Sequence, residues 1–195
     1  MQCADTAMYF AKSLGRNNLK FYSPGMNSES DNRSKLEREL RAAFNRRELD
    51  VYYQPKVDVQ SREVVGFEAL LRWEHPELGW VDPAEFISVA EDSGLIKPIG
   101  EWVLRQSARQ LKIWHALGYN HLHMAVNVSA KQFQLADFPL EVAIILREED
   151  VNPKHIELEL TESLIMDNPD QVILMLHVLK NLGVRLSVDD FGTGY

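Results

Sequence analysis

The sequence predicts an α/β protein with a mainly parallel sheet or barrel. From residue 51 onward, strand-like segments alternate with amphipathic helical segments, which is typical of right-handed βαβ units. Several helical segments also begin at Asp or Asn followed by Pro and end at Gly, which are helix start and stop signals. The chain has 195 residues, 45% apolar and 26% charged, which excludes collagen-like, disulfide-stapled and largely disordered classes.

The first part of the chain carries weaker signals. Residues 1–22 are expected to form a short helix, a turn and a strand, and residues 23–34 have the polar, aperiodic composition of an exposed linker. A helix is expected from Ser34, which forms a capping box with Glu37. Its apolar residues at helical spacing are Leu36, Leu40 and Phe44.

The later elements follow from strand and helix patterns. Two strands, 51–59 and 63–73, are expected to form a hairpin because only a short polar turn separates them. The further strands are expected at 121–128, 155–161 and 184–188, and the helices at 83–94, up to about 117, near 140–149 and 169–183.

Charge and cysteine content limit the classes of function. The 21 basic and 29 acidic residues give a net charge of −8, which disfavours non-specific binding to nucleic acid or to an anionic membrane. A single cysteine, Cys3, excludes an intrachain disulfide and fits a reducing cytosol. No apolar run is long enough for a membrane span and no signal-peptide pattern occurs, so we expect a cytoplasmic location for this portion.

Four predicted strands share one pattern: one face is wholly apolar, and the other bears an oxygen ligand near the C-terminal end of the strand. Residues two apart in a strand share a face. The oxygen-bearing residues are Glu68, Asn127, Glu159 and Asp189. Active sites of parallel α/β folds lie at this end of the strands, so we expect these residues to converge. An open sheet whose outer face is polar only for solubility is the alternative; helices long enough to cover both faces weigh against it.

Carboxylates that converge repel one another unless a cation lies among them. A set of oxygen ligands suits Mg²⁺ or Mn²⁺ better than zinc. If the chain turns after Asp189, then Asp190 can ligate a second ion. Two such ions are the usual apparatus for phosphodiester cleavage, so the pattern favours a metal-dependent phosphodiesterase.

The oxygen-bearing residues belong to short sequence motifs. The first is the string Glu68-Ala69-Leu70-Leu71-Arg72-Trp73. The other motifs are Tyr53-Gln54-Pro55-Lys56, Asp82-Pro83 with Phe86-Ile87 and Ala90-Glu91, Asn127-Val128-Ser129, Glu159-Leu160-Thr161-Glu162-Ser163 and Asp189-Asp190-Phe191-Gly192-Thr193-Gly194. Over residues 36–195 these motifs and their order resemble the EAL family of cyclic di-GMP phosphodiesterases, and the shared order makes the resemblance specific.

The resemblance implies a fold, a reaction and residue roles. The fold is a modified (β/α)₈ barrel of the TIM type whose first strand is antiparallel, and the reaction is hydrolysis of cyclic di-GMP to linear pGpG with Mg²⁺ or Mn²⁺. The matching metal ligands are Glu68, Asn127, Glu159, Asp189 and, for a second ion, Asp190. Glu162 matches a glutamate that steadies the loop after Asp189 and Asp190, which places Glu68, Glu162 and Asp190 in the catalytic group. Gln54 and Arg72 match substrate contacts, and a guanidinium suits a phosphate.

Residues 1–22 resemble the end of a GGDEF diguanylate cyclase domain, on the string Ala4-Asp5-Thr6-Ala7-Met8-Tyr9-Phe10-Ala11-Lys12. The expected organisation is therefore a GGDEF remnant at 1–22, a linker at 23–34 and the N-terminal part of an EAL domain at 35–195. Such a barrel takes about 250 residues. The family's later strands, with a lysine, an aspartate, a glutamate and a glutamine, are not in this sequence, so we expect an incomplete barrel and little activity from these residues alone.

Two other functions stay open at this point. The first is a catalytically inactive module that binds cyclic di-GMP, although the ligands present here argue against the loss of the metal site. The second is a regulatory part of a diguanylate cyclase. Homodimerisation through the EAL domain and an upstream membrane anchor are also left open by the sequence.

Overall fold

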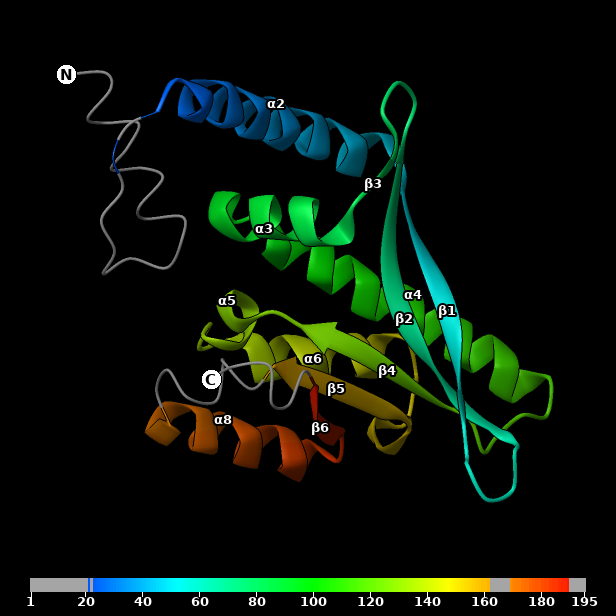
Figure 1. Ribbon diagram of the computed structural model, residues 1–195. Helices are drawn as coiled ribbons and strands as arrows, with labels where there is room; N and C mark the ends of the chain where they lie inside the picture. The colour runs from blue at the N-terminus through cyan, green and yellow to red at the C-terminus, as the bar shows by residue number, and fades with distance from the viewer. Residues whose placement is uncertain (1–20, 22, 162–168, 190–195) are drawn as a thin grey trace.

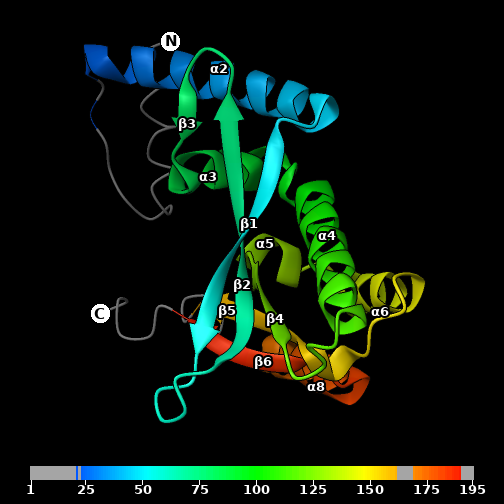
Figure 2. The ribbon, with the colours of Figure 1, turned by 90° about the vertical axis from the view of Figure 1, so that its right-hand side faces the viewer.

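A curved sheet with helices along one face organises the chain (Figures 1 and 2). The computed structural model describes residue 21 and residues 23–161 and 169–189. The six-stranded sheet has the order β1-β2-β4-β5-β6, with β3 paired to β2. Its strands are β1 (Leu49–Val57), β2 (Val64–His75), β3 (Gly79–Val81), β4 (His123–Val128), β5 (Ile156–Thr161) and β6 (Arg185–Asp189).

The strand directions confirm the predicted topology. β1 is antiparallel to β2, whereas β2, β4, β5 and β6 run parallel to one another. The expected hairpin and the mainly parallel sheet are therefore both present. Among the described residues, β1 and β6 are the two edge strands along the sheet order, as expected for an incomplete barrel.

The helices follow the predicted order. They are α2 (Pro24–Arg46), α3 (Pro83–Ser93), α4 (Ile96–Ala116), α5 (Ala130–Phe133), α6 (Phe138–Glu148) and α8 (Pro169–Leu182), with a 3₁₀ turn at Pro153–His155. Figure 2 shows α4, α6 and α8 along one side of the sheet, while α2 and α3 lie near the end of β2. No helix in residues 24–161 or 169–189 is both long enough and apolar enough to cross a membrane.

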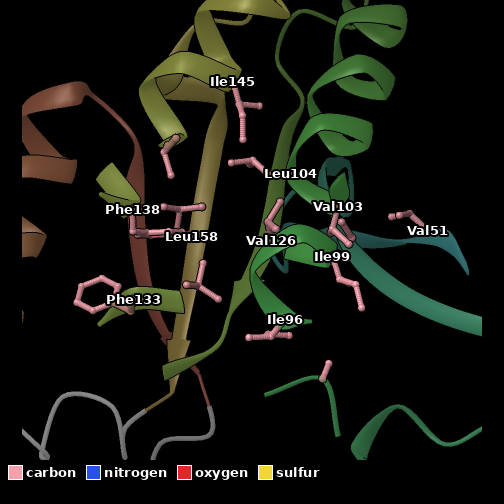
Figure 3. Packing of buried hydrophobic residues seen from close by; sticks show 14 of the residues in the cluster. Val51, Ile96, Ile99, Val103, Leu104, Val126, Phe133, Phe138, Ile145 and Leu158 are labelled. Atoms are coloured by element: carbon pink, nitrogen blue, oxygen red, sulfur yellow. The ribbon is translucent and has the colours of Figure 1, made fainter. Parts of the chain in front are cut away.

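The apolar face of each strand packs against this helical layer. Val126 of β4 and Leu158 of β5 are buried beside Leu104 of α4 and Ile145 of α6 (Figure 3). The opposite face carries His123, Ala125 and Asn127 on β4 and Glu157, Glu159 and Thr161 on β5, with Ala125 and Glu159 buried and Asn127 exposed. The polar side chains of the two strands thus gather on the face away from the helices.

Local signals explain the ends of α3. The Asp82 side chain accepts a hydrogen bond from the backbone N–H of Ala84, which is the expected N-cap. Gly94 ends the helix with φ 75°, a left-handed conformation that glycine adopts without a Cβ penalty.

The start of α2 differs from the sequence expectation. The helix begins at Pro24 and runs through Ser34, so the capping box lies inside the helix and residues 24–34 are helical. Aperiodicity was a misleading signal here because polar contacts hold this part of the helix against α3. Arg33 Nη2 donates to the backbone oxygen of Ser88 at 3.2 Å and pairs with Asp92. Whether this segment also separates two domains stays a prediction.

Two short elements have no counterpart among the predicted ones. β3 is a three-residue strand that pairs with the end of β2. α5 is a four-residue helix with a complete Ser129–Gln132 capping box. Both are too short for an apolar period to develop. The helix and strand expected in residues 1–22 lie outside the described residues, apart from residue 21.

Candidate metal and phosphodiester site

Glu68 and Asn127 form the first contact of the candidate site. Glu68 lies in β2, and its backbone pairs with Ala125 of the neighbouring strand β4. Asn127 is two residues further along β4, on the same face as Ala125. Its Nδ2 donates a hydrogen bond to Glu68 Oε1 at 2.7 Å. The structure thus brings together two of the four residues that strand parity selected.

Glu159 lies beside this pair on the next strand. Its backbone pairs with Asn127, and the residue is 8% exposed. Burial raises the pKa of the Glu159 carboxyl, the hydrogen bond and charge of Lys56 oppose that rise, and the charges of Glu68 and Glu157 add to it. A buried carboxylate that faces two others is stabilised by a nearby cation, either a side chain or a metal ion.

Lys56 of β1 is the cation that contacts Glu159 in the structure. Its Nζ lies 2.8 Å from Glu159 Oε1 and 3.3 Å from Glu157 Oε1. Burial lowers the pKa of Lys56, but its hydrogen bonds and charge interactions with the two glutamates outweigh that effect and raise it. The described part of the site thus joins two carboxylates on β5 to one ammonium from β1, and His123 Nε2 of β4 lies 3.6 Å from Glu157 Oε2.

Asp189 occupies the last position of β6, which is one strand beyond Glu159. Its backbone pairs with Thr161, and the side chain is exposed. Glu159 pairs with Ser187 in the same ladder, so Asp189 lies on the same face as Ser187 and further toward the C-terminal end of the strands. Glu162 and Asp190 lie outside the described residues, and their placement stays a prediction.

The two expected substrate contacts lie on the β1–β2 hairpin. The backbone of Gln54 pairs directly with that of Glu68, and its side chain is exposed. Arg72 is four residues after Glu68 on the same strand, and its Nη1 donates to the backbone oxygen of Leu71 at 2.9 Å. Gln54 is thus adjacent to the candidate ligands, whereas Arg72 lies nearer to β3.

The donor chemistry of this site fits a hard divalent ion. Glu68, Asn127 and Glu159 offer carboxylate and amide oxygens from three adjacent strands, which are the ligands that Mg²⁺ and Mn²⁺ prefer. Among the side chains that the structure describes, no group of three or more His, Cys, Asp or Glu residues is close enough to hold a metal ion by itself. The candidate ligand set therefore combines the amide of Asn127 with the carboxylates of the neighbouring strands.

Reasoning from the sequence did not assign a role to Lys56 or Glu157. A usable signal was present, because Lys56 is two residues from Gln54 and Glu157 is two residues from Glu159. Residues two apart in a strand share a face, so both belong to the same polar surface as the candidate ligands.

Residues 37–195 match the EAL domain family. A Pseudomonas aeruginosa protein named bifunctional diguanylate cyclase/cyclic di-GMP phosphodiesterase MucR is 44% identical over 192 residues. The cyclic di-GMP phosphodiesterase PdeR of Escherichia coli is 41% identical over 194 residues. Each alignment covers 98% of this chain, but it covers only 28% of MucR and 29% of PdeR.

Solved structures show the same similarity in three dimensions. A structure described as the PaMucR phosphodiesterase in complex with c-di-GMP matches with a TM-score of 0.80 and 44% identity, covering 83% of this chain and 65% of that one. The EAL enzyme Bd1971, in a form with cAMP and cyclic di-GMP bound, matches with a TM-score of 0.79 and 33% identity, covering 86% and 46%. The expected α/β fold with a mostly parallel, TIM-barrel-like sheet is confirmed, and the chain belongs to the EAL domain family.

Proposed function

We propose that this chain supplies the metal-binding half of a phosphodiesterase that hydrolyses cyclic di-GMP to linear pGpG. The observation that carries the proposal is the alignment of Glu68, Asn127 and Glu159 on three adjacent strands, with the Asn127–Glu68 contact at 2.7 Å. Relatives that share these strands are named cyclic di-GMP phosphodiesterases. One solved relative is described as a complex with c-di-GMP.

In this proposal each residue has a separate task. Glu68, Asn127, Glu159 and Asp189 hold Mg²⁺ or Mn²⁺, Asp190 holds a second ion, and Glu162 steadies the loop that carries Asp190. When bound, such ions activate the attacking water and offset the charge that develops on the phosphate. Gln54 and Arg72 bind and orient the dinucleotide, with the Arg72 guanidinium suited to a phosphate oxygen.

The test is Glu68→Gln in the natural chain that carries this sequence, expressed at its full length. Glu74→Gln is a matched control, because Glu74 is an exposed carboxylate in the same strand, paired with Trp80 at the far end of β2. Loss of a metal ligand is expected to lower cyclic di-GMP turnover by roughly 100-fold or more, whereas the control keeps its activity. Turnover is followed by chromatographic separation of cyclic di-GMP from pGpG.

Two results would count against the proposal. Unchanged turnover in Glu68→Gln would exclude Glu68 as a metal ligand. Binding of cyclic di-GMP by the wild type without any hydrolysis, at saturating Mg²⁺ or Mn²⁺, would favour the alternative function of an inactive binding module.

A further inference from the structure

We propose that Lys56 is a built-in counter-ion of Glu159. In the absence of metal, Lys56 stabilises the carboxylates on the polar face of the sheet, and it competes with a divalent ion for the Glu159 carboxylate. The inference deepens the proposed function and rests on it, because it concerns the same metal site. Lys56 is here a positioning residue and has no part in the chemistry of the substrate.

The first argument is the reach of the side chain. Lys56 lies on β1, and Glu157 and Glu159 lie on β5, with β2 and β4 between these strands in the sheet. Curvature of the sheet nevertheless lets Nζ come within 2.8 Å of Glu159 Oε1 and 3.3 Å of Glu157 Oε1. One ammonium therefore links an end strand of the described sheet to the strand next to the other end, across the polar face.

The second argument is local backbone geometry. The β1–β2 register shifts between Lys56 and Val57, after the pairing of Lys56 with Gly66. Such an irregularity redirects a side chain and increases the local twist of a strand. Because Gly66 carries no side chain, no Cβ from the partner strand lies beside Lys56 on that face. The His123 ring occupies the space beside Gly66, so it is the register shift that helps to direct the Lys56 side chain.

The third argument is electrostatic. Glu68 on β2 and Glu157 and Glu159 on β5 are three carboxyl groups on one face of the sheet, and the side chains of Glu157 and Glu159 are 14% and 9% exposed. Unpaired carboxylates at this depth are costly, so the metal-free sheet needs a cation. Lys56, 34% exposed, supplies it from the solvent side.

The same contact has a consequence for metal binding. Lys56 donates to one of the two carboxylate oxygens of Glu159, so a metal ion bound to Glu159 has to displace the ammonium or share the carboxylate with it. Glu157 then remains as a partner for Lys56, since it already lies within 3.3 Å. Removal of the ammonium should therefore increase the affinity of the site for a divalent ion.

The experiment compares Lys56→Met with the wild type in the natural full-length chain, using Mn²⁺ alone as the probe. Mn²⁺ affinity is measured by electron paramagnetic resonance titration, and thermal unfolding is measured with EDTA and with Mn²⁺. We expect about tenfold tighter Mn²⁺ binding, because a unit charge beside a dication is lost. In EDTA we also expect a lower midpoint of thermal unfolding for Lys56→Met than for the wild type, and we expect Mn²⁺ to raise it again.

Two variants serve as controls. Lys56→Arg keeps the positive charge and can contact both glutamates, so it should bind Mn²⁺ no more tightly than the wild type. Lys97→Met removes a lysine that pairs with Asp137 and Glu141 elsewhere on the surface, so it should leave Mn²⁺ affinity unchanged.

The outcomes separate this inference from the proposed function. If the wild type binds Mn²⁺ but Lys56→Met binds it equally or more weakly, Lys56 does not compete with the metal ion. The inference is then overturned, but the metal site of the proposed function is not. If Lys56→Arg binds Mn²⁺ more tightly than the wild type, the competition is also overturned. If Lys56→Met stays unfolded with and without Mn²⁺, the inference that a metal ion can replace the ammonium as the counter-ion of Glu159 is overturned. If neither the wild type nor Lys56→Met binds Mn²⁺, the metal site of the proposed function fails together with this inference.

Discussion

Gly66 is a position in the sheet where the packing leaves little room for a side chain. A Cβ at this residue would lie 2.5 Å from the His123 backbone oxygen and 2.9 Å from two ring carbons of His123. Gly66 pairs with His123 across the β2–β4 ladder and lies two residues before Glu68. Gly66→Ala would therefore force β2 and β4 apart next to the Glu68–Asn127 contact.

Two opposing effects determine the size of the change. Gly66 is not among the glycines with positive φ, so alanine can adopt its backbone conformation. At a position with free space, such a substitution would stabilise the protein by about 0.4–1 kcal/mol. Overpacking against backbone in a well-packed sheet costs about 1–3 kcal/mol, and the steric effect is expected to prevail. We expect Gly66→Ala to lower the free energy of unfolding by about 1–2 kcal/mol.

Urea unfolding followed by circular dichroism measures this change, and NMR of the His123 ring reports the local displacement. Gly79→Ala is the control: Gly79 has φ 70° and no neighbouring atom within 4 Å of the place that a Cβ would take, so the substitution costs backbone strain alone and leaves the His123 resonance unchanged. In a His123→Ala background, Gly66→Ala should still destabilise, because the backbone oxygen remains. A neutral or stabilising Gly66→Ala would refute the steric argument.

Two further predictions concern stability. Leu158→Ala removes a fully buried side chain from β5 and should lower the free energy of unfolding, measured in urea, by about 2–5 kcal/mol. Leu140 is 63% exposed, so Leu140→Ala should change this free energy by less than about 0.5 kcal/mol. Equal effects of the two substitutions would contradict the burial of Leu158 against the helices. Burial raises the pKa of Asp92, but Lys131 and Arg33 outweigh burial and lower it. Above the ordinary aspartate pKa of about 3.9, the wild type should therefore have a higher free energy of unfolding than Asp92→Asn, by less than about 1 kcal/mol. This difference should disappear as the pH falls through the lower pKa of Asp92 in the folded state. A difference that persists in acid would refute the ion pairs.

Alternating hydrophobicity was sufficient to predict most of the sheet. The apolar residues of β4 and β5 are buried against the helices, and this placement fixes the opposite face for Asn127 and Glu159. The same alternation placed Glu68 on the polar face of β2, where it contacts Asn127. Period-2 patterns are reliable here because one face of each strand is covered.

Long-range polar contacts were beyond the reach of the sequence pattern. Lys56 and Glu159 are separated by 103 residues, and their contact depends on the curvature of the whole sheet. Arg33 and Asp92 are 59 residues apart, and their pairing helps to hold a helix that has no apolar period at its start. Periodicity describes which face a residue occupies, but it does not describe which distant residue meets it across that face.

The geometry of the candidate site is enforced by the opposite side of the sheet. Asn127 and Glu159 are register partners in the β4–β5 ladder, as are Val126 and Leu158 next to them. A slip of one residue would move Leu158 to the polar face and Glu159 to the apolar one. Because Leu158 is fully buried, its exposure alone would cost about 1.5–3 kcal/mol, and the burial of an unpaired carboxylate would cost more. Substitutions in the apolar layer should therefore affect metal binding through register, even where they lie on the far side of the sheet from every ligand.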